Sequence, residues 1–436
     1  MYHGDNLVFL RGINSHTVDL IATDPPFNKG YDFFAKTGSR SRGAKFQDRW
    51  NWDKDVHQEW VDQLKDDWPH TYHVIEGSRN SYGDDMGAFL CFMAVRLVEM
   101  RRILKQTGSI YLHCDPTASH YLKELLDAIF GKKNFINEII WFKGYRGTAR
   151  KKRYQQEHDT VFLYAKSSNH YNWNPIYGEY KDKSMKRYNK IDDEGRRYAK
   201  IKRRRVNGDV YYGKCYPKGK LLGDVIDVPI LAATASERTD YPTQKPIELY
   251  RKFIQASSNQ DEVVFDPFCG CATTLIAAEQ LKRKWVGMDI WDGAHQSVID
   301  RLQKECFLDG PEKERMDILI SEGKVYYKTE APVRTDDGVV ATPFLKVKMK
   351  EPEEKMSRDY MFEKLIEMNG IKCAGCNRIF DDKMYLVLDH SQPKSDGGIN
   401  AITNRILLCH PCNTIKSNKL TLSGLVAENK RRGRLR

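Results

Sequence analysis

Short apolar, β-branched runs that each stop at an acidic residue constrain the fold of this chain most strongly. The run VDLIAT stops at Asp24, VVF stops at Asp266 and WVGM stops at Asp289. Apolar runs of this length, bounded by Pro, Gly or Asp, are typical of buried strands. In open α/β sheets, ligands bind beyond the carboxyl ends of the strands, which is where these three acids would stand. The pattern therefore predicts a binding site built from several strand ends.

Segments with helical periodicity separate these runs. Further strands are expected over residues 109–115, 138–142 and 158–166. Apolar residues recur at helical spacing over residues 89–104, 120–130, 246–258 and 273–284. Alternating strands and helices predict a parallel, doubly wound α/β sheet with helices on both faces.

The positive charge of the chain is concentrated in one segment. The whole chain has a net charge of +12, whereas residues 143–220 alone hold 22 Lys and Arg against 8 Asp and Glu, together with 11 of the 23 tyrosines. Basic side chains neutralise phosphates and interleaved aromatic rings stack on bases, so the segment predicts contact with nucleic acid. A single cluster such as Lys202–Arg205 is equally well explained as a solvated charged face.

Length and apolar content exclude several classes of protein. The 436 residues, 40% of them hydrophobic, exceed one ordinary domain and exclude a wholly disordered chain. No run approaches the ~20 apolar residues of a membrane span, and the N-terminal residues lack the apolar stretch of a signal peptide. We therefore expect a cytoplasmic protein of two or three domains.

The segment Asp24–Phe27 has the chemistry of a site for an exocyclic amine. Two consecutive prolines stiffen the loop and remove backbone donors, which leaves the Asp24 carboxylate and the Pro25 carbonyl as acceptors. Two acceptors match the two N–H donors of an amine and would aim its lone pair at an electrophile. The ring of Phe27 could stack on the base. The alternative is a plain turn after a buried strand.

A second strand end has the features of a nucleotide site. The strand that ends at Asp266 runs into a turn containing Gly270 and then into a helix that begins near Thr273. Gly270 permits close backbone approach, and a helix N-terminus favours a carboxylate. Roughly 20 residues later, Asp289 would offer its carboxylate to ribose hydroxyls. Alone, this pattern describes nucleotide sites in general.

Together these segments make the chain resemble the DNA amino-methyltransferases that use S-adenosylmethionine. The resemblance covers about residues 1–300 and is carried by the motifs DPPFNKGYDF, GSIYLHCDPTASHYL, NEIIW, YPTQKP, FDPFCGCATT and WVGMDI. The amine motif precedes the cofactor motif with the basic insert between them. This order is similar to the β group of the family, which includes the modification subunits of type III restriction systems. The resemblance implies a Rossmann-like sheet with residues 143–235 as an inserted target-recognition region.

The resemblance also implies roles for single residues. Asp24, Pro25, Pro26 and Phe27 would hold a base that is flipped out of the duplex. The residues implied to contact the cofactor are Asp5, Thr243, Gln244, Lys245, Phe265, Asp266, Phe268, Gly270, Thr273 and Asp289. The DPPF form implies the adenine 6-amino group as acceptor, with the cytosine 4-amino group as the alternative. Ala272 replaces the second glycine of the FxGxG pattern of the family, and its methyl group would be tolerated if residue 272 already lies in the following helix.

The C-terminal region carries a metal-binding pattern. Four of the ten cysteines form two CxxC pairs, Cys373 with Cys376 and Cys409 with Cys412, separated by 32 residues. In a chain that is not secreted, such pairs indicate a metal site rather than disulfides. Four thiolates suit a tetrahedral, structural Zn²⁺. A region of roughly 80 residues has a small core, for which a metal staple is physically sensible.

Around these cysteines the sequence resembles the HNH nuclease motif. The segments LVLDHSQPKSDGGINAITNRILLC and CNTIKSNK carry the resemblance, which implies a small ββα-metal domain. It implies His390 as the general base that activates water and Asn404 as the residue that positions the His390 loop. Asp389 and Asn413 are implied as ligands of a catalytic Mg²⁺ or Mn²⁺, since hard cations prefer oxygen ligands.

We therefore expect a methyltransferase over residues 1–300, a connecting segment with a little sheet over 301–355 and a nuclease over 356–436. The expected partner is double-stranded DNA, whose phosphates Lys416 and Lys419 could hold, and members of this family often form homodimers. Methylation and cleavage on one chain resemble a single-chain restriction–modification system of a bacterium or phage. Two alternatives stay open: an HNH region that only clamps DNA, and a nuclease that acts mainly on methylated or mobile-element DNA.

Overall fold

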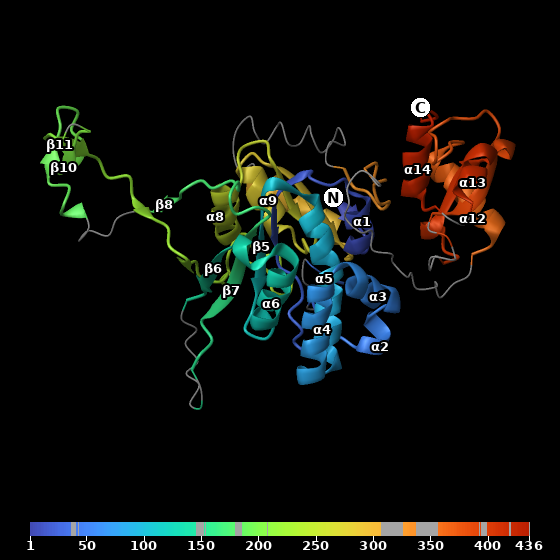
Figure 1. Cartoon of the computed structure of the whole chain (residues 1–436), viewed down its shortest axis with the longest axis horizontal. Helices are drawn as coiled ribbons and strands as arrows, with labels where there is room; N and C mark the ends of the chain where they lie inside the picture. The colour runs from blue at the N-terminus through green and yellow to red at the C-terminus, as the bar shows by residue number, and fades with distance from the viewer. Residues whose placement is uncertain are drawn as a thin grey trace.

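The computed structural model describes residues 1–35, 41, 43–144, 152, 154–178, 185–206, 208–306, 326–336, 356–391, 393, 399–417 and 420–435. Within them the chain forms a large α/β body, a small outlying sheet and a C-terminal domain (Figure 1). None of the helices in this part of the chain combines the length and apolar character that a bilayer crossing requires.

One mixed sheet forms the centre of the α/β body. Among the described residues its eight strands run in the order β1 (Tyr2–His3), β15 (Lys284–Asp289), β14 (Val263–Asp266), β2 (Val18–Thr23), β5 (Leu104–Cys114), β7 (His158–Ala165), β6 (Phe135–Phe142) and β13 (Val225–Asp227). Strand β2 pairs in parallel with β14 and β5, whereas β7 is antiparallel to both β5 and β6. The prediction of a parallel sheet is therefore wrong for β7. Its apolar run indicates burial on both faces, and burial does not encode strand direction.

Helices cover both faces of the sheet, which confirms the doubly wound arrangement. One face packs against α1 (Asn6–Gly12), α4 (Pro69–Tyr82), α5 (Asp84–Ile103) and α6 (Ser119–Phe130). The other packs against α8 (Ile247–Ser257), α9 (Thr273–Gln280) and α10 (Ala294–Arg301). Alternate residues of β2 serve the two layers, since Ile21 packs into the first and its neighbours Leu20 and Ala22 into the second. The predicted helices are thus present, although α5 begins earlier and α9 ends earlier than expected.

The expected insert, residues 143–235, contains two strands of this main sheet, β7 and β13. Between them, β8 (Tyr177–Gly178) pairs with β12 (Lys220–Leu221). Beyond that pair lies a three-stranded antiparallel sheet of β9 (Lys190–Ile191), β10 (Arg197–Arg204) and β11 (Val210–Cys215). Figure 1 shows β10 and β11 standing well away from the α/β body. We call this three-stranded sheet the basic arm.

Part of the expected connecting segment belongs to the α/β body. Residues 326–336 run along the N-terminal residues, where the N–H of His3 donates to the Lys328 carbonyl at 2.9 Å. Further on, the Thr335 N–H donates to the Asn14 side chain at 2.8 Å, and the Arg334 side chain is buried. The sheet expected in this connecting segment also includes residues 342–349, which lie outside the described residues.

The C-terminal domain has the expected ββα arrangement. Strand β16 (Leu386–His390) pairs antiparallel with β17 (Arg405–Cys409), which runs directly into α13 (His410–Lys416). Helices α12 (Arg358–Asn369) and α14 (Leu422–Arg431) complete the domain. The four cysteines of the CxxC pairs lie inside its small apolar core.

Candidate functional site

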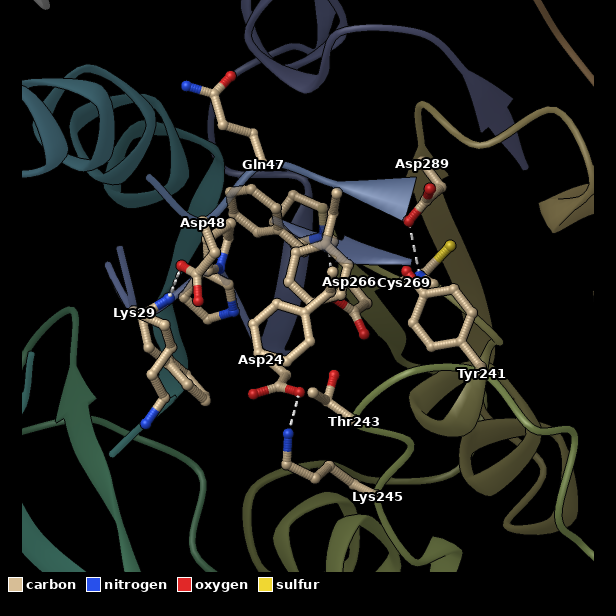
Figure 2. A pocket seen from close by; sticks show the side chains of 18 of the residues that line it. Asp24, Lys29, Gln47, Asp48, Tyr241, Thr243, Lys245, Asp266, Cys269 and Asp289 are labelled. Carbon is tan, nitrogen blue, oxygen red and sulfur yellow. Dashed lines mark hydrogen bonds and ion pairs between the residues drawn. The ribbon is translucent and has the colours of Figure 1, made fainter. Parts of the chain in front are cut away.

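Asp24 stands directly after β2, beside a cavity of about 1210 Å³. Pro25, Pro26 and Phe27 line the same cavity, so the four predicted acceptor residues lie together. The Lys245 ammonium forms an ion pair with Asp24 Oδ2, and the two side chains point toward one another in Figure 2. The sequence placed Lys245 near the cofactor. In the structure Lys245 lines this cavity and is also the cationic partner of the Asp24 carboxylate.

Asp48 fixes the backbone of the segment Asp24–Phe27, which we call the acceptor loop. This role was not predicted from the sequence. Its Oδ1 accepts the backbone N–H of Phe27 at 2.6 Å and that of Asn28 at 2.7 Å. Burial raises the pKa of Asp48 to about 6, although these hydrogen bonds and the charge of Lys29 act in the opposite direction. The two amides follow Pro26 directly, so Asp48 fixes the direction in which the chain leaves the prolines.

The loop that follows β14 carries the predicted cofactor residues Phe268 and Gly270, and we call it the cofactor loop. It lies beside the acceptor loop. Gly270 has a φ of +48°, and a Cβ at this position would lie 2.9 Å from the ring of Tyr241, so only glycine fits. Ala272 has a φ of +69° and is the N-cap of α9, so it lies one residue before the helix and does not meet the condition under which its methyl group would be tolerated. It takes a left-handed conformation that favours glycine. The N-terminus of α9 has no side-chain cap, which leaves its first N–H groups available to a carboxylate.

Asp266 joins the two loops. Its Oδ1 accepts the Thr23 hydroxyl at 2.6 Å and the Phe268 N–H at 3.1 Å, and its Oδ2 accepts the Thr274 hydroxyl at 2.6 Å. Burial raises the pKa of Asp266 to about 6, although these donors lower it. The carboxylate therefore links the end of β2 to the loop after β14 and to the first turn of α9.

Asp289 supports the cofactor loop from the neighbouring strand. Its carboxylate accepts the Gly270 N–H at 2.7 Å and the Trp291 N–H at 2.8 Å. Burial raises the pKa of Asp289, although these amides lower it. In Figure 2 the side chain lies beside Cys269 and Tyr241, away from the ion pair of Asp24.

The other predicted cofactor residues differ in placement. Thr243, Phe268 and Thr273 line the cavity, whereas Phe265 is fully buried in the core and does not. Asp5 lines the cavity, and its Oδ1 accepts the Leu7 N–H at 2.8 Å and pairs with Arg96 at 2.9 Å.

Gln244 folds its own segment, although it also borders the cavity. Its Oε1 accepts the Thr239 N–H at 2.7 Å, and its Nε2 donates to the Glu237 carbonyl at 2.7 Å. These bonds hold the loop that carries Thr243 and Lys245 against the cavity.

The basic arm carries cations in close register. Lys200 lies directly opposite Lys214, and Lys202 lies opposite Tyr212. Like charges that face each other across a sheet are destabilising, and most side chains of β10 and β11 are exposed. A bound polyanion would therefore reduce the charge repulsion within the arm.

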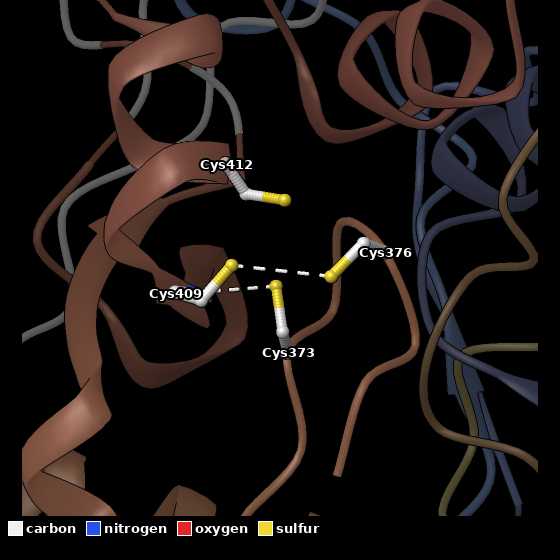
Figure 3. A group of neighbouring side chains, drawn as sticks. All are labelled: Cys373, Cys376, Cys409 and Cys412. Carbon is white, nitrogen blue, oxygen red and sulfur yellow. Dashed lines mark hydrogen bonds between the residues drawn. The ribbon is translucent and has the colours of Figure 1, made fainter. Parts of the chain in front are cut away.

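The four cysteines Cys373, Cys376, Cys409 and Cys412 form one cluster (Figure 3). Their sulfur atoms all lie within 4.8 Å of one another, and the residues are buried. Sulfurs held ~2.3 Å from a shared tetrahedral ion would be ~3.8 Å apart. Cys376 and Cys409, whose sulfurs are 3.9 Å apart, already match this spacing. The donor set and its geometry fit Zn²⁺.

His390 and Asn404 lie at the neighbouring ends of β16 and β17. His390 Nε2 lies 3.0 Å from Asn400 Oδ1, and its Nδ1 lies 3.3 Å from the Arg405 guanidinium. Asn404 is fully buried and donates to the Ile399 carbonyl at 3.1 Å, while its own carbonyl accepts the N–H of Ser391, next to His390. Asn404 thus contacts the chain on both sides of the loop that follows His390.

Asp389 faces a buried cation. Lys416 is 1% exposed, and its ammonium lies 3.1 Å from Asp389 Oδ2. The expectation that Lys416 holds DNA phosphates is therefore wrong, because burial in this ion pair removes it from the surface. Lys419 lies outside the described residues. Asn413 lies on α13, which packs against β16.

Comparison with known proteins agrees with both halves of the chain. The DNA methylase family model matches residues 18–300, and the HNH endonuclease model matches residues 373–419. The type II methyltransferase M.EcaI of Enterobacter cloacae is 30% identical over 271 residues, which cover 51% of this chain and 60% of that protein. The DNA adenine methyltransferase YhdJ of Escherichia coli is 26% identical over 290 residues, which cover 66% of this chain and 77% of that protein.

Solved structures resemble the α/β body more distantly. The M1.HpyAVI–SAM complex aligns with 17% identity and a TM-score of 0.38, over 69% of this chain and 97% of that one. The cytosine-N4-specific PvuII DNA methyltransferase aligns with 17% identity and a TM-score of 0.39, over 76% of this chain and 94% of that one. The family match alone spans well over half of the 436 residues. The chain therefore belongs to the DNA methylase family and carries an HNH endonuclease domain behind it.

Proposed function

We propose that residues 1–300 transfer a methyl group from S-adenosylmethionine to the 6-amino group of adenine in DNA. The observation that carries this proposal is that the acceptor loop of Asp24 and the cofactor loop of Gly270 border one cavity and are joined through Asp266. Its volume of about 1210 Å³ exceeds the ~300–1,000 Å³ of most ligand sites. The space suits a cofactor together with a flipped base.

The residues around the cofactor loop fit this cofactor. Because residue 270 is a glycine, no side chain keeps a ligand away from the backbone there. The uncapped N-terminus of α9 suits the carboxylate of the methionine part of the cofactor. The Asp289 carboxylate suits the ribose hydroxyls. When bound, the cofactor supplies a methyl group on a positively charged sulfur.

The acceptor loop would then orient the amine. The Asp24 carboxylate and the Pro25 carbonyl accept its two N–H groups, and the ring of Phe27 stacks on the base. The acid in the DPPF motif and the relative named as a DNA adenine methyltransferase support adenine. The cytosine 4-amino group is the alternative, because the PvuII enzyme is cytosine-N4-specific.

Expression in a methylation-deficient bacterium tests this proposal. We expect single-molecule sequencing of host DNA to reveal one sequence motif with methylated adenine. A mark on cytosine N4 would overturn the choice of base, and unmarked DNA would refute the activity. Asp24→Ala should abolish the mark while cofactor affinity stays within about tenfold, because Asp24 contacts the amine rather than the cofactor.

We also propose that the basic arm holds DNA and that residues 356–436 cut it in a reaction that requires Mg²⁺ or Mn²⁺. In the proposal His390 activates water, Asn404 holds the His390 loop, and Asp389 and Asn413 bind the cation. The support is the matched HNH family and the position of Asp389, His390 and Asn404 at one end of the β16–β17 pair. Methylation would protect the chain's own target from cleavage.

Purified protein tests the nuclease with Mg²⁺ or Mn²⁺ on methylated and unmethylated copies of the target. We expect cleavage of the unmethylated copy alone, and its loss in His390→Ala with methylation unchanged. No cleavage of either copy would favour an HNH domain that only clamps DNA. Preferential cleavage of the methylated copy would refute protection and favour a methyl-directed nuclease.

A further inference from the structure

His113 is buried between two carboxylates behind the acceptor loop. It lies near the end of β5 and is 1% exposed. Its Nδ1 atom lies 3.2 Å from Asp24 Oδ1, and its Nε2 atom lies 3.4 Å from Asp159 Oδ2. Asp24 follows β2 and Asp159 lies on β7, so the three residues come from adjacent strands of the sheet. The topology therefore places an imidazole ring directly behind the proposed amine acceptor.

Asp24, His113 and Asp159 form a row, and a lysine pairs with the carboxylate at each end of it. Lys245 pairs with the other oxygen of Asp24, and Lys143 Nζ donates to Asp159 Oδ1 at 2.7 Å. Burial alone would raise the pKa of Asp159, but the hydrogen bonds and charges of His113 and Lys143 outweigh it and hold that pKa below its ordinary value. Asp159 therefore remains a carboxylate and can accept the Nε2–H of His113.

The contact between Asp24 and His113 is incomplete. Asp24 Oδ1 and His113 Nδ1 are both buried, and neither has a hydrogen-bond partner among the described residues, although they face each other at 3.2 Å. When Nε2 carries the ring proton, Nδ1 presents a lone pair to the carboxylate, and two acceptors form no hydrogen bond. One added proton would complete the bond. A buried, unsatisfied pair of this kind is costly and calls for a functional reason.

We propose that the target amine supplies this proton and that His113 receives it through Asp24. This inference rests on the proposed methyltransferase function. The lone pair of the amine forms the new N–CH₃ bond while the S–CH₃ bond of the methyl donor breaks, and that electron pair stays on sulfur. As the new bond forms and positive charge develops on the nitrogen, one of its protons passes in the same step to Asp24 and on to Nδ1 of His113. A neutral methylamino group and an imidazolium result.

In this scheme Asp159 is a positioning residue. It fixes the ring so that Nδ1 faces Asp24, and its charge stabilises the imidazolium. The rings of Phe27 and Trp141 lie 5.6 Å and 5.4 Å from the imidazole and shield it from water. The other charged groups near this row are the paired Lys29 and Asp115, and Asp266.

Single-turnover methyl transfer tests the proposal in the full-length protein. For His113→Gln we expect the rate constant to fall about 100-fold, as for loss of a proton acceptor, while the Kd values for DNA and cofactor change by less than about threefold. The acidic limb of the wild-type pH–rate profile, where a protonated ring can accept no proton, should disappear. Asp159→Asn should move that limb to lower pH, because the imidazolium loses its stabilising charge. His120→Gln, at an exposed position of α6, is the matched control and should change nothing.

A measurement independent of activity is the ¹⁵N NMR spectrum of histidine-labelled protein without cofactor. We expect His113 as the neutral tautomer with its proton on Nε2. A wild-type rate in His113→Gln would overturn the proposal. A slow variant that keeps the acidic limb would also overturn it, since the ring would then be only a spacer. A wild-type protein that methylates no DNA refutes the proposed function itself.

Discussion

The Lys245 ammonium and the Asp24 carboxylate form an ion pair beside the cavity, although the two residues are 221 positions apart in the chain. The pair fixes the position of one oxygen of the Asp24 carboxylate. In the proposed reaction, the approaching amine would therefore meet an acceptor whose direction is already set.

Replacing Lys245 should slow methyl transfer without loosening the cofactor. In Lys245→Gln we expect the single-turnover rate constant to fall by about 10- to 100-fold, because Asp24 loses the charge that orients it. Cofactor affinity, measured by titration calorimetry, should change by less than about threefold. Lys252→Gln is the control, because Lys252 forms a similar ion pair with Glu248 on the surface of α8. A parallel loss of cofactor affinity would show that Lys245 serves the cofactor instead.

Asp266 should make stability depend on pH. Its folded-state pKa of about 6 lies above the ordinary 3.8, so the folded protein binds more protons between these values and its stability falls as pH rises through this window. Asp266→Asn removes this effect. The unfolding free energy of the variant relative to the wild type should therefore rise by about 3 kcal/mol between pH 4 and pH 7, since each pKa unit is worth about 1.36 kcal/mol. Urea unfolding across this range measures it, and a constant difference would contradict it.

Ala272 should tolerate glycine and reject a β-branched residue. Ala272→Gly relieves about 1 kcal/mol of left-handed strain and loses about 0.8 kcal/mol from one buried methyl group, so the melting temperature should stay close to that of the wild type. Ala272→Val should cost more than about 2 kcal/mol and weaken cofactor binding, because a β-branched residue strongly resists φ near +69°. Thermal unfolding and cofactor titration measure both effects. Normal binding by the valine variant would show that the loop is more plastic than its burial suggests.

The basic arm should bind phosphates through its facing lysines. Replacing both Lys200 and Lys214 by Gln should weaken binding to all DNA sequences alike and reduce the slope of log K against log salt by about 2. The same change removes a like-charge pair, so the arm itself should not be destabilised. Fluorescence anisotropy at several salt concentrations measures the slope, with Lys65→Gln as the exposed control. An unchanged slope would place the DNA elsewhere.

Zinc removal should unfold the C-terminal domain alone. The four cysteines lie within its apolar core, so loss of the ion leaves that core without its staple. A strong chelator, or Cys409→Ser, should abolish the melting transition of residues 356–436 and leave cofactor binding by the α/β body intact. Elemental analysis of the purified protein should give one zinc per chain. A chelator-resistant domain would refute the site.

The elements and the two loops could be predicted from sequence because their signals are local. Asp24 and Asp289 end apolar runs, and Gly270 lies in a turn between strand and helix. The direction of β7 could not be predicted, because an apolar run indicates burial without indicating pairing.

The side chains that contact the acceptor loop and His113 could not be predicted either, because the folded structure brings them there from distant parts of the sequence. Asp48 reaches the acceptor loop from 20 positions away, and Asp159 reaches His113 across 46. No pattern along the chain marks such pairs. Whether Ala272 lies inside α9 could not be decided from sequence, and the turn after Gly270 puts it one residue before the helix begins.

The three hydrogen bonds of Asp266 connect the end of β2 to the loop after β14 and to the first turn of α9. In the proposed reaction, this scaffold would set the spacing between the cofactor and the acceptor loop, and the flipped base would be the part that moves. The basic arm, by contrast, belongs to the segment between β7 and β13, and its described strands stand well away from the α/β body (Figure 1). Because the arm is proposed to hold DNA and the two loops are proposed to carry the reaction, an exchanged arm should change the recognised DNA sequence and leave the rate constant for methyl transfer unchanged.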